Sequence, residues 1–179
     1  TYDLKPRSVP EVEKRFAEAL PHREKYSKLG AFWHTEVGPL NQIIHAWPYE
    51  SMEARNRIRA EAAQDPNWPP KIGDYIVNMQ SEFFISFPGA PTLRPGTFGP
   101  VYELRYYAVA YGGIPWALKA WEAGLPKRLE LSDLAFVGYS EVGRLNRHMH
   151  IWAYKDFNHR FETRAKVVAE GVWPPKPAP

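Results

Sequence analysis

Two stretches, residues 40–49 and 145–154, alternate between two kinds of side chain. Successive side chains of a β-strand point to opposite faces, so every second residue shares a face. In both stretches one face carries mainly asparagine, histidine, tryptophan and tyrosine, and the other is small and mostly apolar. The pattern predicts two strands whose apolar face packs beneath helices and whose polar-aromatic face looks into a space between two sheets.

Helical and extended patterns alternate around these two strands. Two amphipathic stretches begin with proline, which suits the first turn of a helix. Ser51 and Asp156 are good N-cap residues, and each precedes another predicted helix. The expected helices therefore cover residues 10–26 and 115–131 and the segments after Ser51 and Asp156, and the other expected strands cover residues 2–4, 31–37, 75–87, 102–109 and 136–142.

The chain is a duplication with an offset of 105 positions. Residues 1–71 align without a gap to residues 106–176, and 23 of these 71 pairs are identical. The identities include His-x-Trp-x-Tyr in the two strands and Trp-Pro-Pro-Lys at the end of each copy. We therefore expect one unit at residues 1–87 and a second at 102–179, joined by a linker at 88–101, of which half is proline and glycine.

The order β-α-β-β-α-β in each unit is that of the ferredoxin-like split βαβ fold. Its helices cover only one face of the sheet, so two units in tandem can cover each other's free face. The sequence therefore predicts an α+β protein in which two tandem ferredoxin-like units form an α+β barrel. The second copy has no counterpart to residues 75–87 and the first lacks the strand start at 102–105, so we expect a trimmed chain or completion by another chain.

The polar-aromatic strand face is the first candidate site, because it occurs in both copies. His45 and His150 are the candidate catalytic residues, since an imidazole titrates near neutral pH and can accept or donate a proton. The expected ligand-binding residues on this face are Asn41, Trp47, Tyr49, Asn146, His148, Trp152 and Tyr154. The alternative interpretation, that these side chains are hydrogen-bonded core residues, stays open.

Two arginine pairs are the second candidate site. Arg55 and Arg59 in the first copy, and Arg160 and Arg164 in the second, lie four residues apart on one face of a predicted helix. Such a pair can clamp a carboxylate or a phosphate, or it can pair with acidic neighbours. Those neighbours are Glu53, Glu61 and Glu162.

The sequence does not favour a metal or a bound cofactor. His148 and His150 form an H-x-H pair that suits two metal ligands, but neither a cysteine nor an adjacent carboxylate accompanies them. Phosphate-loop, dinucleotide, G-x-S-x-G and H-E-x-x-H motifs are missing from the sequence. We therefore expect no metal site and no cofactor.

Composition narrows the classes of partner. The 23 Lys and Arg against 20 Asp and Glu give a net charge of only +3 without a basic stripe, which argues against nucleic acid. The absence of cysteine excludes a disulfide scaffold and a cysteine nucleophile. No apolar run reaches the roughly 20 residues that span a bilayer, so we expect a soluble protein without a membrane span.

One segment of the second copy is very similar to the signature of the NIPSNAP family. It reads Leu145-Asn-Arg-His-Met-His-Ile-Trp-Ala-Tyr-Lys-Asp and is followed by Arg160. Residues 40–50 resemble the same signature almost as well. Tyr-Glu-Leu-Arg at 102–105 adds to the resemblance. The resemblance implies a dimeric α+β barrel and a possible homo-oligomer. The mild basicity and the absence of cysteine are compatible with both compartments, so we expect the cytoplasm if the protein is bacterial and the mitochondrial matrix if it is eukaryotic.

Two functions follow as hypotheses, and the sequence leaves open whether the protein is an enzyme. In the first, the barrel binds a small aromatic or apolar molecule and can transform it without a cofactor, as members of the wider barrel superfamily do. In the second, the protein is a non-enzymatic scaffold with protein partners, as described for mitochondrial members of the family. The missing catalytic motifs favour the second hypothesis, and the duplicated polar-aromatic face favours the first.

Overall fold

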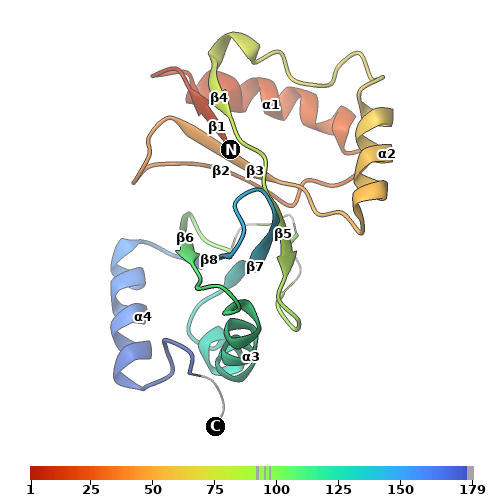
Figure 1. Cartoon of the computed structure of the whole chain (residues 1–179). Coiled ribbons are helices and arrows are strands. Elements are labelled where there is room, and N and C mark those ends of the chain that lie inside the picture. The colour runs from red at the N-terminus through yellow and green to blue at the C-terminus, as the bar shows by residue number, and fades with distance from the viewer. Residues whose placement is uncertain (92, 95, 97, 177–179) are drawn as a thin grey trace. The chain divides into compact units, whose positions relative to one another are not determined.

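The computed structural model describes all residues except 92, 95, 97 and 177–179 (Figure 1). The chain divides into two compact units, Thr1–Ser81 and Glu82–Pro179, so residues 88–101 belong to the second unit. Among the described residues, no helix is long and apolar enough to cross a membrane.

The first unit is a four-stranded antiparallel sheet with two helices, in the order β2-β3-β1-β4. Its element order, β-α-β-β-α-β, confirms the predicted split βαβ unit. The Ser51 hydroxyl caps the second helix by accepting a hydrogen bond from the Ala54 amide at 3.1 Å. The elements are β1 (Tyr2–Leu4), α1 (Val9–Arg23), β2 (Ala31–His34), β3 (Gln42–Ala46), α2 (Met52–Ala62), the short 3-10 helix η1 (Gly73–Tyr75) and β4 (Ile76–Met79).

The second unit repeats this plan with a longer sheet in the order β5-β7-β8-β6. Asp156 caps the last helix through a 2.7 Å hydrogen bond from the His159 amide. The two units together confirm the predicted α+β fold of tandem ferredoxin-like units. The elements are β5 (Phe83–Ser86), β6 (Val101–Ala108), α3 (Ile114–Leu129), β7 (Leu134–Val142), β8 (Arg147–Tyr154) and α4 (Phe157–Ala169).

The segment predicted as one strand at residues 75–87 is two strands in two sheets. β4 pairs with β1 in the first sheet, whereas β5 pairs with β7 in the second. The polar residues 80–82 separate them, and β5 satisfies backbone groups of β7 that would otherwise form an open sheet edge. The second sheet therefore obtains its fourth strand from the segment that precedes β6, on the edge opposite to the one that β4 occupies in the first sheet.

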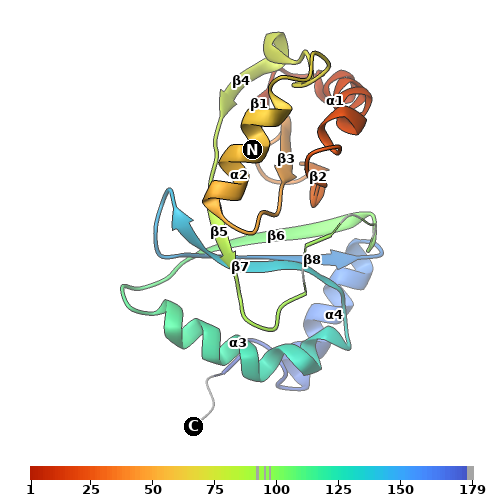
Figure 2. The ribbon, with the colours of Figure 1, turned by 90° about the vertical axis from the view of Figure 1, so that its right-hand side faces the viewer.

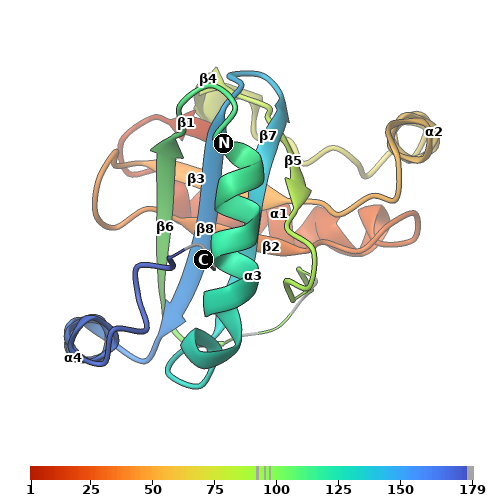
Figure 3. The ribbon, with the colours of Figure 1, turned by 60° about the horizontal axis from the view of Figure 1, so that its bottom comes forward.

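The polar-aromatic face lies beneath the helices, which corrects the prediction that it faces away from them. Figures 2 and 3 show α3 lying across β7 and β8. The Trp121 ring of α3 lies 5.0 Å from that of His150, and Phe16 of α1 lies 5.4 Å from His45. Large aromatic rings bury more apolar surface than the small residues of the opposite face, so they form the layer under the helix.

The asparagines Asn41 and Asn146 shape the turns between the second and third strands of each unit. Their φ angles are 56° and 55°, in the left-handed region. Each carbonyl oxygen accepts a backbone hydrogen bond, from Leu4 at 2.8 Å and from Val109 at 2.7 Å. Asparagine tolerates this backbone region better than most residues, so a structural requirement explains its presence in both copies.

Asn146→Ala is expected to lower the free energy of unfolding by about 1–2 kcal/mol, because alanine lacks the short polar side chain that lets asparagine tolerate left-handed backbone. Asn146→Gly should leave it nearly unchanged, because glycine adopts this conformation freely. Urea unfolding measures both, with Asn158→Ala on helix α4 as a control that should not destabilise. Equal losses in the Ala and Gly variants would instead assign the role to the amide side chain.

Candidate functional site

A buried arginine joins helix, strand and loop in the same way in each unit. Arg128, in the last turn of α3, lies with its guanidinium carbon 3.9 Å from the centre of the Trp152 ring. It donates hydrogen bonds to the Ser132 hydroxyl at 2.6 Å and the Tyr154 hydroxyl at 3.3 Å. Stacking and hydrogen bonding together hold this cation in the core.

Arg23 repeats this arrangement in the first unit. Its guanidinium carbon lies 4.5 Å from the centre of the Trp47 ring, and it donates to Ser27 and Tyr49, each at 2.8 Å. Arg23 is 3% exposed and Arg128 is 2% exposed. Each residue of the set has its identical counterpart 105 positions away, so the structural element was duplicated whole.

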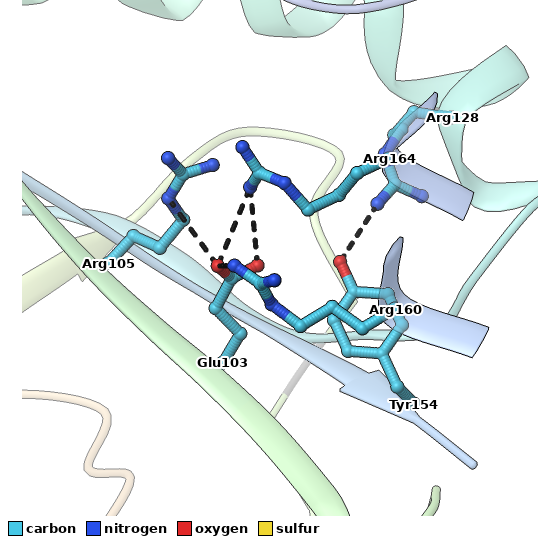
Figure 4. Close-up of polar contacts among 6 residues, drawn as sticks. All are labelled: Glu103, Arg105, Arg128, Tyr154, Arg160 and Arg164. Atoms are coloured by element: carbon cyan, nitrogen blue, oxygen red, sulfur yellow. Dashed lines mark hydrogen bonds and ion pairs between the residues drawn. The ribbon is translucent and has the colours of Figure 1, made fainter. Parts of the chain in front are cut away.

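In the second unit, further arginines converge on the carboxylate of Glu103 (Figure 4). Glu103 lies on β6, and Arg160 and Arg164 reach it from α4. Arg160 donates a hydrogen bond to Glu103, and Arg164 Nη1 lies 3.5 Å from both carboxylate oxygens. Arg105 completes the group, with its Nε 3.9 Å from Glu103 Oε1.

This arginine cluster, defined as Glu103, Arg105, Arg128, Arg160 and Arg164, is not electrically balanced. Four guanidinium groups face one carboxylate, which leaves an excess of three positive charges. Burial lowers the pKa of Arg128, an effect that Tyr154 and Glu103 partly offset. Arg128 Nε is buried without a hydrogen-bond partner in the described part of the chain. A cation in this setting is stabilised by an anion.

A hollow of about 40 Å³ opens beside the cluster. One water molecule needs roughly 10–15 Å³, and pockets for drug-sized molecules measure roughly 300–1,000 Å³. The hollow is therefore large enough for a head group such as a carboxylate or phosphate and too small for an aromatic molecule. It is lined by Glu103, Arg105, Arg128, Trp152, Tyr154, Arg164, Val167, Val168 and Trp173.

The structure brings together only part of the predicted site. Trp152, Tyr154 and Arg164 line the hollow, and Arg160 belongs to the arginine cluster. His148 and His150 lie under α3, with their rings 4.9 Å and 5.0 Å from that of Trp121. The predicted residues of the first unit are not among those that line this hollow. Within their own unit, His45, Trp47 and Tyr49 lie beneath α1, Asn41 lies in its turn, and Arg55 and Arg59 lie on α2.

The buried His148 and His150 and the partly buried His45 are neutral groups of the core. Burial lowers the pKa of His45 and of His148 to about 4, and that of His150 to about 2. Trp47 Nε1 donates to His45 Nδ1 at 2.7 Å, and His148 Nδ1 lies 3.2 Å from the Gly138 carbonyl oxygen. These pKa values are far from those that suit an acid–base catalyst near neutral pH.

Across the described residues, no group of three or more His, Cys, Asp or Glu side chains is arranged to hold a metal ion. The rings of His148 and His150 lie 5.3 Å apart. The H-x-H pair is thus packed between aromatic rings of β6 and α3, including Tyr107, which stacks on both imidazoles.

The model of the NIPSNAP family matches residues 1–91 and 102–178, which together make up most of the chain. The chain belongs to the NIPSNAP family. The segment between the two matches, 92–101, lies within the Pro- and Gly-rich stretch that was expected as a linker.

Named relatives of this NIPSNAP protein come from several eukaryotes. It is 30% identical over 178 residues to a NipSnap homolog of Dictyostelium discoideum, with 97% of this chain and 75% of that protein covered. Identity to NipSnap of Drosophila melanogaster is 28%, with 82% of this chain aligned and 55% of the relative. The chain thus spans little more than half the length of the second relative.

A solved structure is also similar to this NIPSNAP protein. The crystal structure of an uncharacterized NIPSNAP-like domain protein from Burkholderia xenovorans shares 33% sequence identity with it. That match covers 52% of this chain and 86% of the other, with a TM-score of 0.48.

Sequence reasoning missed Glu103 and Arg105 as site residues, although both lie in the Tyr-Glu-Leu-Arg segment that carried the family resemblance. It also assigned other acids as partners of Arg160 and Arg164, whereas Glu103 on β6 is their contact in the structure. Arg128 and Ser132 were detectable, because both are identical to their counterparts at the offset of 105.

Acid should destabilise this NIPSNAP protein through its buried histidines. Their folded pKa values lie below the ordinary value near 6.5, so the unfolded chain binds protons that the folded chain does not. The free energy of unfolding should fall as the pH drops from about 6.5 toward 4, by up to about 1.4 kcal/mol per pH unit for each histidine. Urea unfolding at a series of pH values measures the slope.

His34 provides a control, because its pKa is shifted in the opposite direction to those of the three core histidines. Its hydrogen bond to Glu13, at 2.6 Å, raises its pKa, and Glu36 at 2.9 Å adds to the effect. Its contribution to stability is complete below about pH 6.5 and is lost as the pH rises through the raised pKa. His34→Gln should therefore lower the free energy of unfolding by a constant amount below about pH 6.5, leave the slope there unchanged, and remove the gain in stability as the pH falls through the raised pKa. A wild-type stability that stays constant from about pH 6.5 to 4 would contradict the assignment of the low-pKa histidines.

Proposed function

We propose that this NIPSNAP protein binds a small organic anion in its second unit, with the anionic head in the hollow beside the arginine cluster. The observation that carries the proposal is the excess of three positive charges on one buried and three partly buried arginine side chains, together with the partnerless Nε of the buried Arg128 in the described part of the chain. Buried cations of this kind are stabilised by an anion with several acceptor oxygens, and arginine binds carboxylate and phosphate in a bidentate manner.

The geometry supports binding in preference to acid–base chemistry at the histidines. His148 and His150 do not line the hollow, and burial keeps both imidazoles neutral at neutral pH. The volume of about 40 Å³ supports a carboxylate or phosphate head in place of the enclosed aromatic molecule that the sequence suggested. Trp152, Tyr154 and Trp173 then act as the wall of the hollow.

Phosphate should raise the melting temperature of the protein relative to chloride at equal ionic strength. A ligand that binds only the folded state at ten times its Kd stabilises by about 1.4 kcal/mol, which corresponds to roughly 3–6 °C for a chain of this size. Arg164→Gln should abolish the phosphate-specific part of the shift, whereas Arg144→Gln, on an exposed turn of the same unit, should retain it. An equal shift in all three proteins would contradict the site.

Glu103→Gln tests the same site, because this variant should bind the anion more tightly, whereas Arg164→Gln should bind it more weakly. Its carboxylate occupies donors of Arg160 and Arg164, so a neutral amide should release them to the anion. Removal of one negative charge at roughly 5 Å is worth about fourfold in affinity even at the dielectric constant of water. A weaker phosphate response in Glu103→Gln would mean that the carboxylate takes part in binding the ligand.

Self-association is a second candidate function, and it corresponds to the scaffold hypothesis. The strand turns of both units expose aliphatic side chains at equivalent positions: Val37, Leu40, Val142 and Leu145. Exposed apolar groups that recur together are typical of protein interaction sites.

If the turns mediate self-association, the wild-type protein should sediment as an oligomer at micromolar concentration. Leu40→Asp with Leu145→Asp should shift it to a monomer, because each charge would be buried in the interface. Met52→Asp, at an exposed residue of α2, is the control and should leave the oligomer intact. A wild-type protein that sediments as a monomer would contradict this second function.

A further inference from the structure

Helix α4 carries an exposed apolar stripe, defined as Phe157, Phe161 and Val168. Their exposed fractions are 50%, 62% and 64%. Residues 4 and 11 positions after Phe157 lie within about 40° of it around a helix of 3.6 residues per turn, so the three side chains share one side of α4. The buried Thr163 and Val167 lie about 120° and 80° around the helix from Phe157, on a different side of α4.

The apolar stripe adjoins the hollow and the arginine cluster. Val168 belongs to both the stripe and the lining of the hollow. The Arg160 guanidinium carbon, whose group donates to Glu103, lies 5.2 Å from the centre of the Phe161 ring. Figure 3 shows α4 beside the end of β8, and this helix supplies both Arg160 and Arg164 and the apolar surface next to them.

We propose that the anion is an amphiphile with one apolar chain, a class that includes alkyl carboxylates; this inference rests on the anion site proposed above. Its head occupies the hollow and its chain lies along the stripe of α4. A hollow of about 40 Å³ accepts the head alone, so the remainder of the ligand has to leave it. Val168 at its rim leads from the arginines onto apolar surface.

The stripe has the length of an alkyl chain. Phe157 and Val168 are eleven residues apart, which spans about 16 Å along the helix axis at 1.5 Å per residue. Burying each methylene group against the stripe adds to affinity, while the excess of positive charge selects a negative head. Apolar length and complementary charge thus favour a single anionic amphiphile over a neutral apolar molecule.

Titration with acetate, hexanoate and decanoate, each below its micelle-forming concentration, tests the inference. The arginine Nε–Hε signals in NMR spectra of the full chain report binding of the head. A methylene group that is half-buried should tighten binding about twofold, so decanoate should bind more than one hundredfold tighter than acetate. Decyltrimethylammonium, with the same chain and a positive head, should not bind at the cluster.

The variant pair Phe157→Ser with Phe161→Ser separates the chain from the head. Both side chains are exposed, so the fold should persist, and decanoate affinity should fall by at least tenfold while acetate binding stays unchanged. Trp116→Ser, at an exposed aromatic residue of α3 in the same unit, is the matched control and should bind decanoate like the wild type.

The outcomes distinguish this inference from the anion site on which it rests. If acetate and decanoate bind with equal affinity, or if the Phe157→Ser and Phe161→Ser variant binds decanoate like the wild type, the ligand is not an amphiphile whose chain lies on the stripe. Either result would leave the anion site in place. An acidic protein segment would then be the better candidate for the exposed stripe. Failure of every anion, phosphate included, to shift the arginine signals would overturn the anion site itself.

Discussion

The contact on which each unit depends is a buried guanidinium stacked on a tryptophan, which lies just past β3 in the first unit and on β8 in the second. Arg23 and Arg128 come from the last turn of α1 and of α3. Each donates one hydrogen bond to a serine in the loop after its helix. Each donates another to a tyrosine, which lies just past β3 in the first unit and at the end of β8 in the second. Such a cation fits the core only if helix, strand and loop all hold their places, because its burial is costly without these partners. The duplication of the whole set shows how strongly this contact constrains the fold.

The second unit adds to this shared contact a charge imbalance. Glu103 offers one carboxylate to arginines from β6 and α4, so the positive charge near Arg128 exceeds what the protein itself neutralises. A structural ion-pair network would tend toward balance, since uncompensated charge destabilises a folded protein. The two copies therefore share an architecture, while the second carries the stronger candidate for ligand binding.

Much of the fold could be predicted from local pattern. The helices at Val9–Arg23 and Ile114–Leu129 lie within a few residues of the predicted ranges, and Ser51 and Asp156 act as helix caps. The candidate site was predicted only in part. Arg160 and Arg164 were identified from their helical spacing, but their partner Glu103 lies about sixty positions away, and such a contact leaves no periodic signal in the sequence.

The sequence by itself determined the repeat, the order of strands and helices and the membership in a family, because these depend on local spacing and on identities at a fixed offset. Only the tertiary structure decided which face of β8 the helix covers, which sheet residues 83–86 join, and where the arginines meet. His150 illustrates the reason: an imidazole is polar in a sequence pattern, yet it becomes a neutral core group once Trp121 packs on it. That packing depends on where distant segments come together.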